Sequence, residues 1–431
     1  MKKFVLIHSY SDFNKGDAGI VISTVQNLRK TYPGCKVDMI STFSSKDNVF
    51  EREHKEISKY ADNMYTSLFP ELFLNFFGKR LGGTVAKIIA MVLFSFKAVL
   101  NILTIKMFRT PLFVNTDEKK AFNAVAEADV VISKGGSFLC SFGTLREDFS
   151  LWRMCYPFKI AKLYSKKTVV LAQSLGPFDS ERSKLIFTKA LNNIDAIYFR
   201  EHKSPALLEA QGIHIPKEKQ KFCPDTAFSI DASEGKSIVE PCKDTMNVGM
   251  TIVDFPFENS EKRENYKASM TAAILLVVEK FNGHVYIFPQ VINTTQFGNE
   301  DLKLAEEIYS NLNIEIQANV SLVKGSYKAT DLVKTYGLMN FFIATRLHSS
   351  IFSVSQNVPI INISYHGTKS EGTFELFDYL DYVIRITEIT PSLLLNKTEL
   401  LIQNSDDIKK QLSYNLVSVR SSITKAFSEL A

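Results

Sequence analysis

The chain contains 431 residues, of which 45% are apolar and 23% are charged, and its formal net charge is +5. These values are typical of a globular protein and exclude a disordered or fibrous chain. Five cysteines without paired spacing argue against a disulfide framework or a zinc ribbon and favour a reducing compartment. The apolar run before Ser9 is too short for a signal peptide and is predicted to be a buried strand.

The first half of the chain alternates between short apolar runs and helical patterns. The first run leads through a polar loop into a helix whose stripe contains Ile20, Val21, Val25 and Leu28. Further strands are predicted at 128–133, 168–172 and 194–199. This alternation favours a parallel sheet covered by helices on both faces, and we assign residues 1–230 to one Rossmann-like domain.

A polar stretch at 229–246 is predicted to be a linker, after which the alternation resumes. Strands are predicted at 247–253, 284–289, 340–344 and 358–363, and helices at 269–281, 301–312 and 349–356. The fold class is therefore α/β, with a second doubly wound domain at 245–400 facing the first across a cleft. We expect residues 401–431 to form a helical segment that could pack back on the N-terminal domain.

One segment, at about 68–113, does not follow the alternation of either domain. Residues 72–116 contain six Lys and Arg but no Asp or Glu, so the rest of the chain is close to neutral and general nucleic-acid binding is disfavoured. A membrane-spanning helix needs about 20 apolar residues, and lysines interrupt each window here. We expect a helix on an anionic membrane surface. The alternative is a buried helix pair whose lysines reach water.

Cationic side chains follow several predicted strands. Arg346 and His348 lie between a strand and a helix, where free backbone N–H groups also favour anions. Arg200 ends another strand, and the loop 364–372 supplies His366 and Lys369. Three loops that direct cations toward one cleft suit a small, multiply charged anion.

Other familiar motifs do not occur. The glycine loops at 15–17 and 134–137 permit close approach of a ligand, but neither is a P-loop, and no G-x-G-x-x-G follows the first strand. No metal-ligand spacing and no G-x-S-x-G elbow is present in the sequence. Classical NAD binding, metal catalysis and hydrolase chemistry are therefore disfavoured.

The motifs, taken in order, resemble the polysaccharide pyruvyl transferase family. The resemblance covers most of the chain outside the basic insert and the last thirty or so residues, although Ala18, Lys134 and His366 depart from the family pattern. The matching motifs are Asn14-Lys15-Gly16-Asp17, Gly135-Gly136-Ser137, Gln173-Ser174-Leu175-Gly176-Pro177, Arg200 with Ser204, Pro224-Asp225-Thr226, Arg346-Leu347-His348, and Ser364-Tyr365 with Lys369 and Gly372.

The resemblance implies a fold similar to GT-B glycosyltransferases and a transfer of pyruvate from phosphoenolpyruvate to two sugar hydroxyls. Phosphoenolpyruvate would be a substrate, and neither a cofactor nor a metal is expected. Histidine can carry a proton near neutral pH, so His348 is the candidate general acid. The candidate donor-binding residues are Arg200, Arg346, Leu347, Lys369, Ser174 and Gly136. The candidate acceptor residues are Asp17, as base or anchor, Asp225 and His366.

The acceptor is expected to be a sugar linked to undecaprenyl diphosphate, a precursor of a capsular or exopolysaccharide repeat unit. The protein would then be cytoplasmic and peripheral on the inner face of the cell membrane, held by residues 72–116. Two alternatives stay open: a nucleotide-sugar-dependent glycosyltransferase of the same architecture, and a peripheral membrane protein without catalysis.

Overall fold

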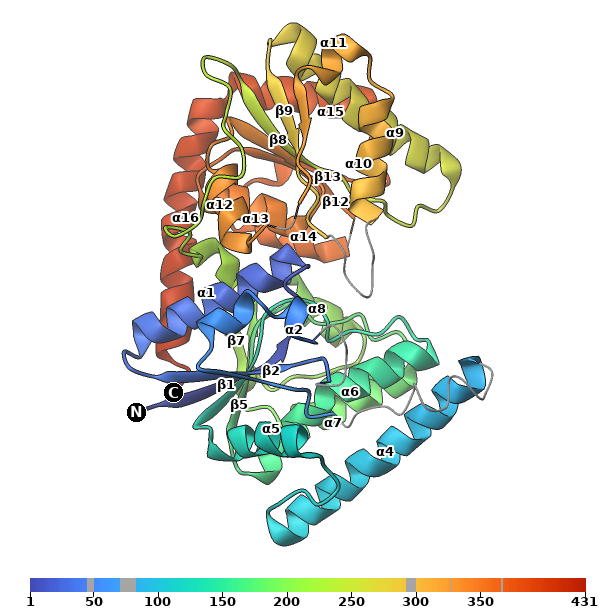
Figure 1. The fold of residues 1–431 in the computed structure, drawn as a ribbon, viewed down its shortest axis with the longest axis vertical. Coiled ribbons are helices and arrows are strands. Elements are labelled where there is room, and N and C mark those ends of the chain that lie inside the picture. Colours follow the sequence, from blue (N-terminus) through green and yellow to red (C-terminus); the bar gives the residue numbers. More distant parts are fainter. Residues whose placement is uncertain (45–49, 70–82, 292–299, 326, 366) are drawn as a thin grey trace.

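The computed structural model describes residues 1–44, 50–69, 83–291, 300–325, 327–365 and 367–431. Figure 1 shows two sheets, each flanked by helices, stacked along the long axis of the molecule. Both sheets are parallel throughout, so the predicted α/β class is confirmed.

The first sheet has the strand order β3-β2-β1-β4-β5-β6-β7. The chain changes direction between β1 and β4, where Phe4 lies opposite Val37 on one side and Val130 on the other. The loops after these two strands diverge there, which is where doubly wound folds bind ligands. The strand bounds are Lys3–Ser9 (β1), Lys36–Ser41 (β2), Asn63–Tyr65 (β3), Val130–Ser133 (β4), Lys167–Gln173 (β5), Ala196–Phe199 (β6) and Gln220–Phe222 (β7).

The second sheet has the order β10-β9-β8-β11-β12-β13, with its change of direction between β8 and β11. All four edge strands of the two sheets, β3, β7, β10 and β13, contain three residues each, and sequence periodicity did not reveal them because runs of that length show no alternation. The bounds are Asn247–Thr251 (β8), His284–Ile287 (β9), Val320–Leu322 (β10), Phe341–Ala344 (β11), Ile360–Ser364 (β12) and Val383–Arg385 (β13).

Helices cover both faces of each sheet (Figure 1). The helix predicted at 269–281 begins earlier, at Ser260, because the side chain of Asn259 accepts a hydrogen bond from the Lys262 N–H and caps it. Helices α1 to α8 span Lys15–Thr31 (α1), Phe50–Glu53 (α2), Gly83–Phe108 (α4), Thr116–Glu127 (α5), Leu145–Leu163 (α6), Glu181–Leu191 (α7) and Lys203–Ala210 (α8). The later helices span Ser260–Leu275 (α9), Glu300–Ser310 (α10), Ile314–Gln317 (α11), Ala329–Tyr336 (α12), Leu347–Ser355 (α13), Gly367–Glu375 (α14), Pro391–Gln403 (α15) and Ser405–Ser428 (α16).

The two domains share one apolar core. Val21 of α1, Phe228 and Phe352 of α13 belong to the same continuous cluster of buried side chains. Contact is so close that a methyl group added to Gly19 would lie 2.6 Å from the Phe352 ring. A second core fills the other face of the first sheet and receives the inner side of α4.

The last helix, α16, contacts both domains. Arg420 donates through Nε to the carbonyl of Phe228 at 3.1 Å and through Nη2 to the carbonyl of Ser355 at 2.7 Å. Lys221 of β7 forms an ion pair of 2.8 Å with Glu429, just beyond the end of this helix. These contacts fasten the C-terminal segment along the N-terminal domain and help to set the relative position of the two sheets.

Helix α4 has two apolar faces. The inner face, with Phe94, Ala98 and Ile105, is buried against the domain. The outer face is apolar and exposed at Ile88, Val92, Phe96, Val99, Leu103 and Met107. The spacing of these outer residues, by three and four, places them on one stripe of the helix.

By length and composition, one helix among the described residues, Ile88–Phe108, could cross a membrane, and a third of its most apolar window is buried inside the protein. A core helix passes the same test. The charge of this segment is partly compensated, because Lys97 pairs with the buried carboxylate of Glu118 at 3.0 Å. Lys79 and Arg80, which contributed to the predicted basic character, lie outside the described residues.

Candidate active site

The site lies where the direction changes of both sheets meet. Helix α1 begins at Lys15, after β1, and its N-cap residue Asn14 forms a backbone bridge with Val291 of the C-terminal domain. Helix α13 follows β11 of the opposite sheet, with Arg346 as its N-cap residue. The loops that sequence analysis singled out therefore converge from two domains.

A chain of buried polar side chains forms the centre of this site. Arg200, at the end of β6, donates from Nε to Ser174 Oγ at 2.7 Å and from Nη1 to Asp225 Oδ2 at 2.8 Å. The same Oδ2 lies 3.6 Å from Nε2 of His348. Only 1–2% of the Arg200 and Asp225 side chains is exposed, whereas 19% of the His348 side chain is exposed. The imidazole is thus the partly exposed end of this network, although its Nε2 atom, which faces Asp225, is buried.

Asp225 is held in its ionised form. Burial by itself would raise the pKa of this carboxyl, but the neighbouring His348, followed by the charge of Arg200, outweighs burial. The pKa of Asp225 consequently lies well below its ordinary value. Its second oxygen accepts from the backbone N–H of Ala227 at 3.0 Å, which fixes the carboxylate plane.

The glycine of the first loop makes room for the histidine. A Cβ added at Gly16 would lie 2.3 Å from Nδ1 of His348, closer than two atoms can approach. Glycine is therefore required at this position by the packing of one domain against the other, and the imidazole is confined between Gly16 and Asp225.

Lys369, in the first turns of α14, adds a cation to this centre. Burial, followed by the nearby charge of Arg200, lowers the pKa of Lys369 to about 8. The helix is pressed against the Arg200 loop, since a Cβ added at Gly372 would lie 2.9 Å from Cβ of Glu201. Glu201 in turn accepts from the backbone N–H groups of Lys203 and Ser204 at the start of α8.

A second ion pair borders the site. Lys134, 2% exposed at its side chain, pairs with Asp17, whose other oxygen accepts from Asn14 Nδ2 at 2.6 Å. The backbone carbonyl of Gly136 accepts from the Ser174 N–H at 2.9 Å, and Gly136 adopts a φ of +135°, which favours glycine. The loop at 134–137 therefore contacts both neighbours: Lys134 holds Asp17 at the start of α1, and Gly136 holds Ser174 after β5.

Arg346 is engaged within the protein. Its guanidinium forks onto both oxygens of Asp301, at the start of α10, and its Nη1 lies 3.1 Å from the Tyr365 hydroxyl. Asp301 also accepts from the Val291 N–H at 3.2 Å, so the pair ties the α13 loop to the loop that meets Asn14. Leu347 is half-buried against the main core.

The structure brings most of the predicted site residues together. Arg200, Ser174, Asp225, His348 and Lys369 form one cluster, and Asp17 and Gly136 border it. His366 lies outside the described residues.

Two polar residues of the site were not recognised in the sequence. Lys134 was visible only as a charged residue where the family pattern favours glycine. Asp301 carried no signal, because an acidic residue at a helix start usually serves the helix alone. Within the described residues, no group of three or more His, Cys, Asp or Glu side chains could hold a metal ion.

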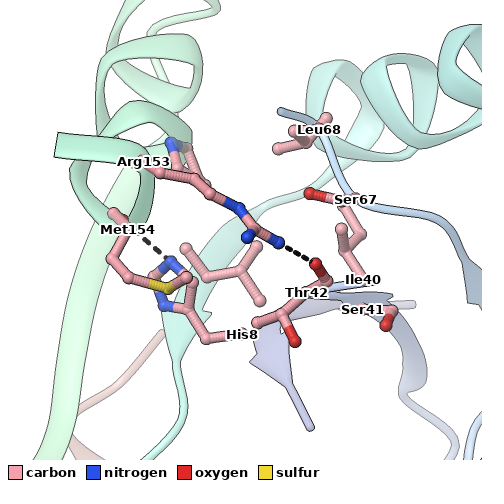
Figure 2. A pocket seen from close by; sticks show the side chains of 10 residues that line it. His8, Ile40, Ser41, Thr42, Ser67, Leu68, Arg153 and Met154 are labelled. Carbon is pink, nitrogen blue, oxygen red and sulfur yellow. Dashed lines mark hydrogen bonds between the residues drawn. The ribbon is translucent and has the colours of Figure 1, made fainter. Parts of the chain in front are cut away.

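A separate small pocket lies at the ends of β1 and β2, against α6 (Figure 2). His8 faces Met154 there, with Nε2 2.9 Å from the Met154 carbonyl and Nδ1 2.9 Å from Ser133 Oγ. Arg153 reaches across to the carbonyl of Thr42. Burial lowers the pKa of His8 to about 3, so this histidine is neutral, and both ring nitrogens are occupied within the protein. We interpret it as a packing residue.

Two parallel α/β domains that face each other with their ligand-binding loops define the GT-B class of architecture, and solved structures support this assignment. A putative UDP-N-acetylglucosamine 2-epimerase from Listeria monocytogenes superposes with a TM-score of 0.56 at 12% identity, covering 100% of this chain and 98% of that one. A glycotransferase of kitacinnamycin gives 0.53 at 10% identity, covering 99% and 97%. These likenesses concern the fold alone.

Sequence comparison is more specific. Residues 14–367 match the family model of the polysaccharide pyruvyl transferases, and the chain belongs to that family. Amylovoran biosynthesis protein AmsJ from Erwinia amylovora is 21% identical over 425 residues, covering 95% of this chain and 94% of that protein. The protein is therefore a transferase of polysaccharide biosynthesis, and the resemblance noted in the sequence is confirmed.

The contact between Gly16 and His348 is testable. Gly16→Ala should displace the imidazole and lower turnover about 100-fold, because small displacements of a reacting group have effects of this order. Thermal unfolding measured alongside should show a folded protein. Gly337→Ala, at the end of α12, is the matched control, since a Cβ there would lie 3.2 Å from Cβ of Gln356 and would require a shift of only a few tenths of an ångström. Full activity of Gly16→Ala would contradict the assigned packing.

Proposed function

We propose that this protein transfers pyruvate from phosphoenolpyruvate to two hydroxyls of a sugar, forming a ketal and releasing phosphate. The observation that carries the proposal is the arrangement of His348, ionised Asp225 and buried Arg200 between the two domains. Family membership supplies the pyruvyl group as the group transferred.

The charge of the centre suits a small anion. Arg200 and Lys369 are the buried cations of the centre, and the neighbouring carboxylates already have partners, Asp225 in Arg200 and Glu201 in the backbone at the start of α8. The charge of Lys369 therefore favours an anion, and the phosphate and carboxylate of phosphoenolpyruvate both meet this requirement. Nη2 of Arg200 makes no hydrogen bond to another described residue and is the nitrogen we assign to the donor.

The other donor residues take smaller roles. Ser174 orients Arg200, and the backbone of Gly136 and the N-terminal turn of α13 at Leu347 allow close approach of a phosphate. Arg346 is paired with Asp301, so most of its charge is compensated, and we assign it chiefly to holding the α13 loop.

His348 would act as the general acid. Protonation of the methylene carbon of phosphoenolpyruvate leaves an oxocarbenium-like carbon, which the first sugar oxygen attacks. Loss of phosphate regenerates such a centre, and the second oxygen completes the ketal. Of the two hydroxyl protons, one replaces the proton that His348 gave and the other leaves with phosphate. Asp225 stabilises the imidazolium and keeps its orientation, as a buried carboxylate does beside a catalytic histidine.

Asp17 is the candidate that receives an acceptor proton or anchors a hydroxyl. It is 23% exposed at its side chain and lies at the start of α1, opposite the α13 loop. Its partner Lys134 holds the carboxylate in place. Asp225 is enclosed by Arg200, His348 and Ala227, so we favour a role beside His348 for it over direct acceptor binding.

The acceptor is proposed to be a sugar linked to undecaprenyl diphosphate at the inner face of the cell membrane. The exposed apolar stripe of α4 offers a membrane contact, with Lys106 and Arg109 exposed near its end. An enzyme that modifies a lipid-linked sugar works at such a surface, which accounts for an apolar helix face left open to solvent.

Mass spectrometry of a lipid-linked oligosaccharide incubated with phosphoenolpyruvate tests the reaction. The product should gain pyruvate minus water, and NMR would locate the ketal. His348→Gln should lower phosphate release about 100- to 10,000-fold, the usual contribution of a general acid. Transfer of a sugar from a nucleotide sugar in the same assay, without consumption of phosphoenolpyruvate, would instead support the glycosyltransferase alternative.

The donor site should show an alkaline limit. Lys369 is charged below its pKa of about 8 and neutral above it, so kcat/KM for phosphoenolpyruvate should fall as the pH rises through about 8. Lys369→Arg keeps its charge and should move this limit to higher pH, whereas Lys369→Met should remove it and raise KM. An alkaline limb that is identical in all three proteins would remove Lys369 from donor binding.

Membrane contact through α4 is tested by vesicle flotation. Val92→Asp combined with Phe96→Asp places two charges on the outer stripe and should abolish binding to vesicles of phosphatidylglycerol and phosphatidylcholine, with turnover on a soluble acceptor retained. Val417→Asp is the matched control, because Val417 is 70% exposed on α16. Undiminished flotation of the double variant would refute the contact.

A further inference from the structure

A groove lies behind α4, away from the site described above. It is bounded by Ile102 of α4, by Trp152 and Tyr156 of α6 and by Leu185 and Ile186 of α7, and its volume is about 490 Å³. Ligand pockets of proteins usually measure roughly 300–1,000 Å³ and are lined mainly by apolar and aromatic side chains. The groove meets both criteria.

Tyr156 forms part of the apolar wall of the groove. The side chain is 3% exposed, and its hydroxyl is buried and makes no hydrogen bond within the described part of the chain. The residue therefore offers its ring to the groove and no accessible polar atom. Together with Trp152 it gives the groove the aromatic lining that suits a hydrocarbon chain.

The groove borders the exposed stripe of α4. Ile102 is half-buried and lies one helical turn from Ala98 of the inner face and from Val99 of the outer stripe. Across the groove, Leu185 of α7 is 54% exposed. A hydrocarbon chain of a lipid in contact with the outer stripe would therefore enter the groove beside Ile102.

The charge at the rim favours an anionic headgroup. Lys159 of α6 and Lys189 of α7 line the groove and are exposed, and none of its lining residues in the described part of the chain is acidic. Asn192 and Asn193 supply neutral hydrogen-bonding groups beside them. Lysines at the edge of an apolar site attract the phosphate of an anionic lipid.

We propose that the groove between α4, α6 and α7 binds one acyl chain of an anionic membrane phospholipid, with Lys159 and Lys189 at its headgroup and Trp152 and Tyr156 along its hydrocarbon. The site rests on the membrane contact proposed for α4, but not on the transfer reaction. Through this groove the protein would bind an individual lipid molecule, in addition to the adsorption of α4 on the membrane surface.

The chain carries its own reporter for this site, because Trp152 is its single tryptophan. Vesicles of phosphatidylglycerol and phosphatidylcholine whose phosphatidylglycerol chains are brominated should quench the Trp152 fluorescence strongly relative to unbrominated vesicles. Ala190→Phe fills the groove, since Ala190 is 4% exposed and lines it, and should reduce the quenching several-fold while flotation persists. Thr188→Phe, on the exposed side of the same helix, is the control.

Three outcomes would overturn the proposal. Equal quenching in Ala190→Phe and Thr188→Phe would show surface contact alone. Flotation of the natural protein without quenching would leave the groove empty of lipid. A concentration-dependent dimer that changes Trp152 fluorescence in the absence of vesicles would assign the groove to a second copy. If Ala190→Phe does not fold, Ile186→Phe tests the same groove. The quenching experiment contains neither phosphoenolpyruvate nor an acceptor sugar. Its result therefore does not depend on whether the proposed transfer reaction is correct.

Discussion

The site depends on a buried carboxylate that lies between Arg200 and His348. Asp225 is enclosed by protein, and an ionised group in that position is tolerated only because Arg200 and His348 lie on the same oxygen. Arg200 and Asp225 belong to the N-terminal domain, whereas His348 belongs to the C-terminal domain. The pairing therefore couples the charge of the site to the position of one domain relative to the other.

Packing around this pair leaves little freedom. Gly16 and Gly372 stand where any larger residue would collide with His348 or with Glu201, so the two domains approach each other through glycines at the site itself. Away from the site, the shared core at Gly19 and Phe352 and the hydrogen bonds of Arg420 on α16 stabilise the same arrangement of the two domains. Dense apolar packing thus positions a small number of polar groups to within a hydrogen-bond length.

Helix α4 combines features of a buried helix and of a helix on a membrane surface. The inner residues, such as Ala98, are buried as the core alternative required, while outer residues such as Val92 and Phe96 are exposed and apolar. The positive charge of residues 72–116 is also weaker evidence for membrane binding than the sequence indicated, because Lys97 is neutralised by Glu118 from the neighbouring helix. Only a structure separates the two faces, since both are apolar in the sequence.

The α/β class, the longer strands and the family could be predicted from the amino-acid sequence, because buried parallel strands and ordered loop motifs are local patterns. The cations Arg200, Arg346 and Lys369 and the imidazole of His348 could also be singled out as candidates, since such residues at strand ends stand out without knowledge of their neighbours, and the structure places Arg200, His348 and Lys369 in one cluster. The contacts that each of these residues makes became apparent only from the packing of the two domains. The pairing of Arg346 with Asp301 and of Lys134 with Asp17, and the position of Asp225 beneath His348, join residues far apart in the chain. Such contacts arise only when two sheets are packed against each other, and no local pattern records them.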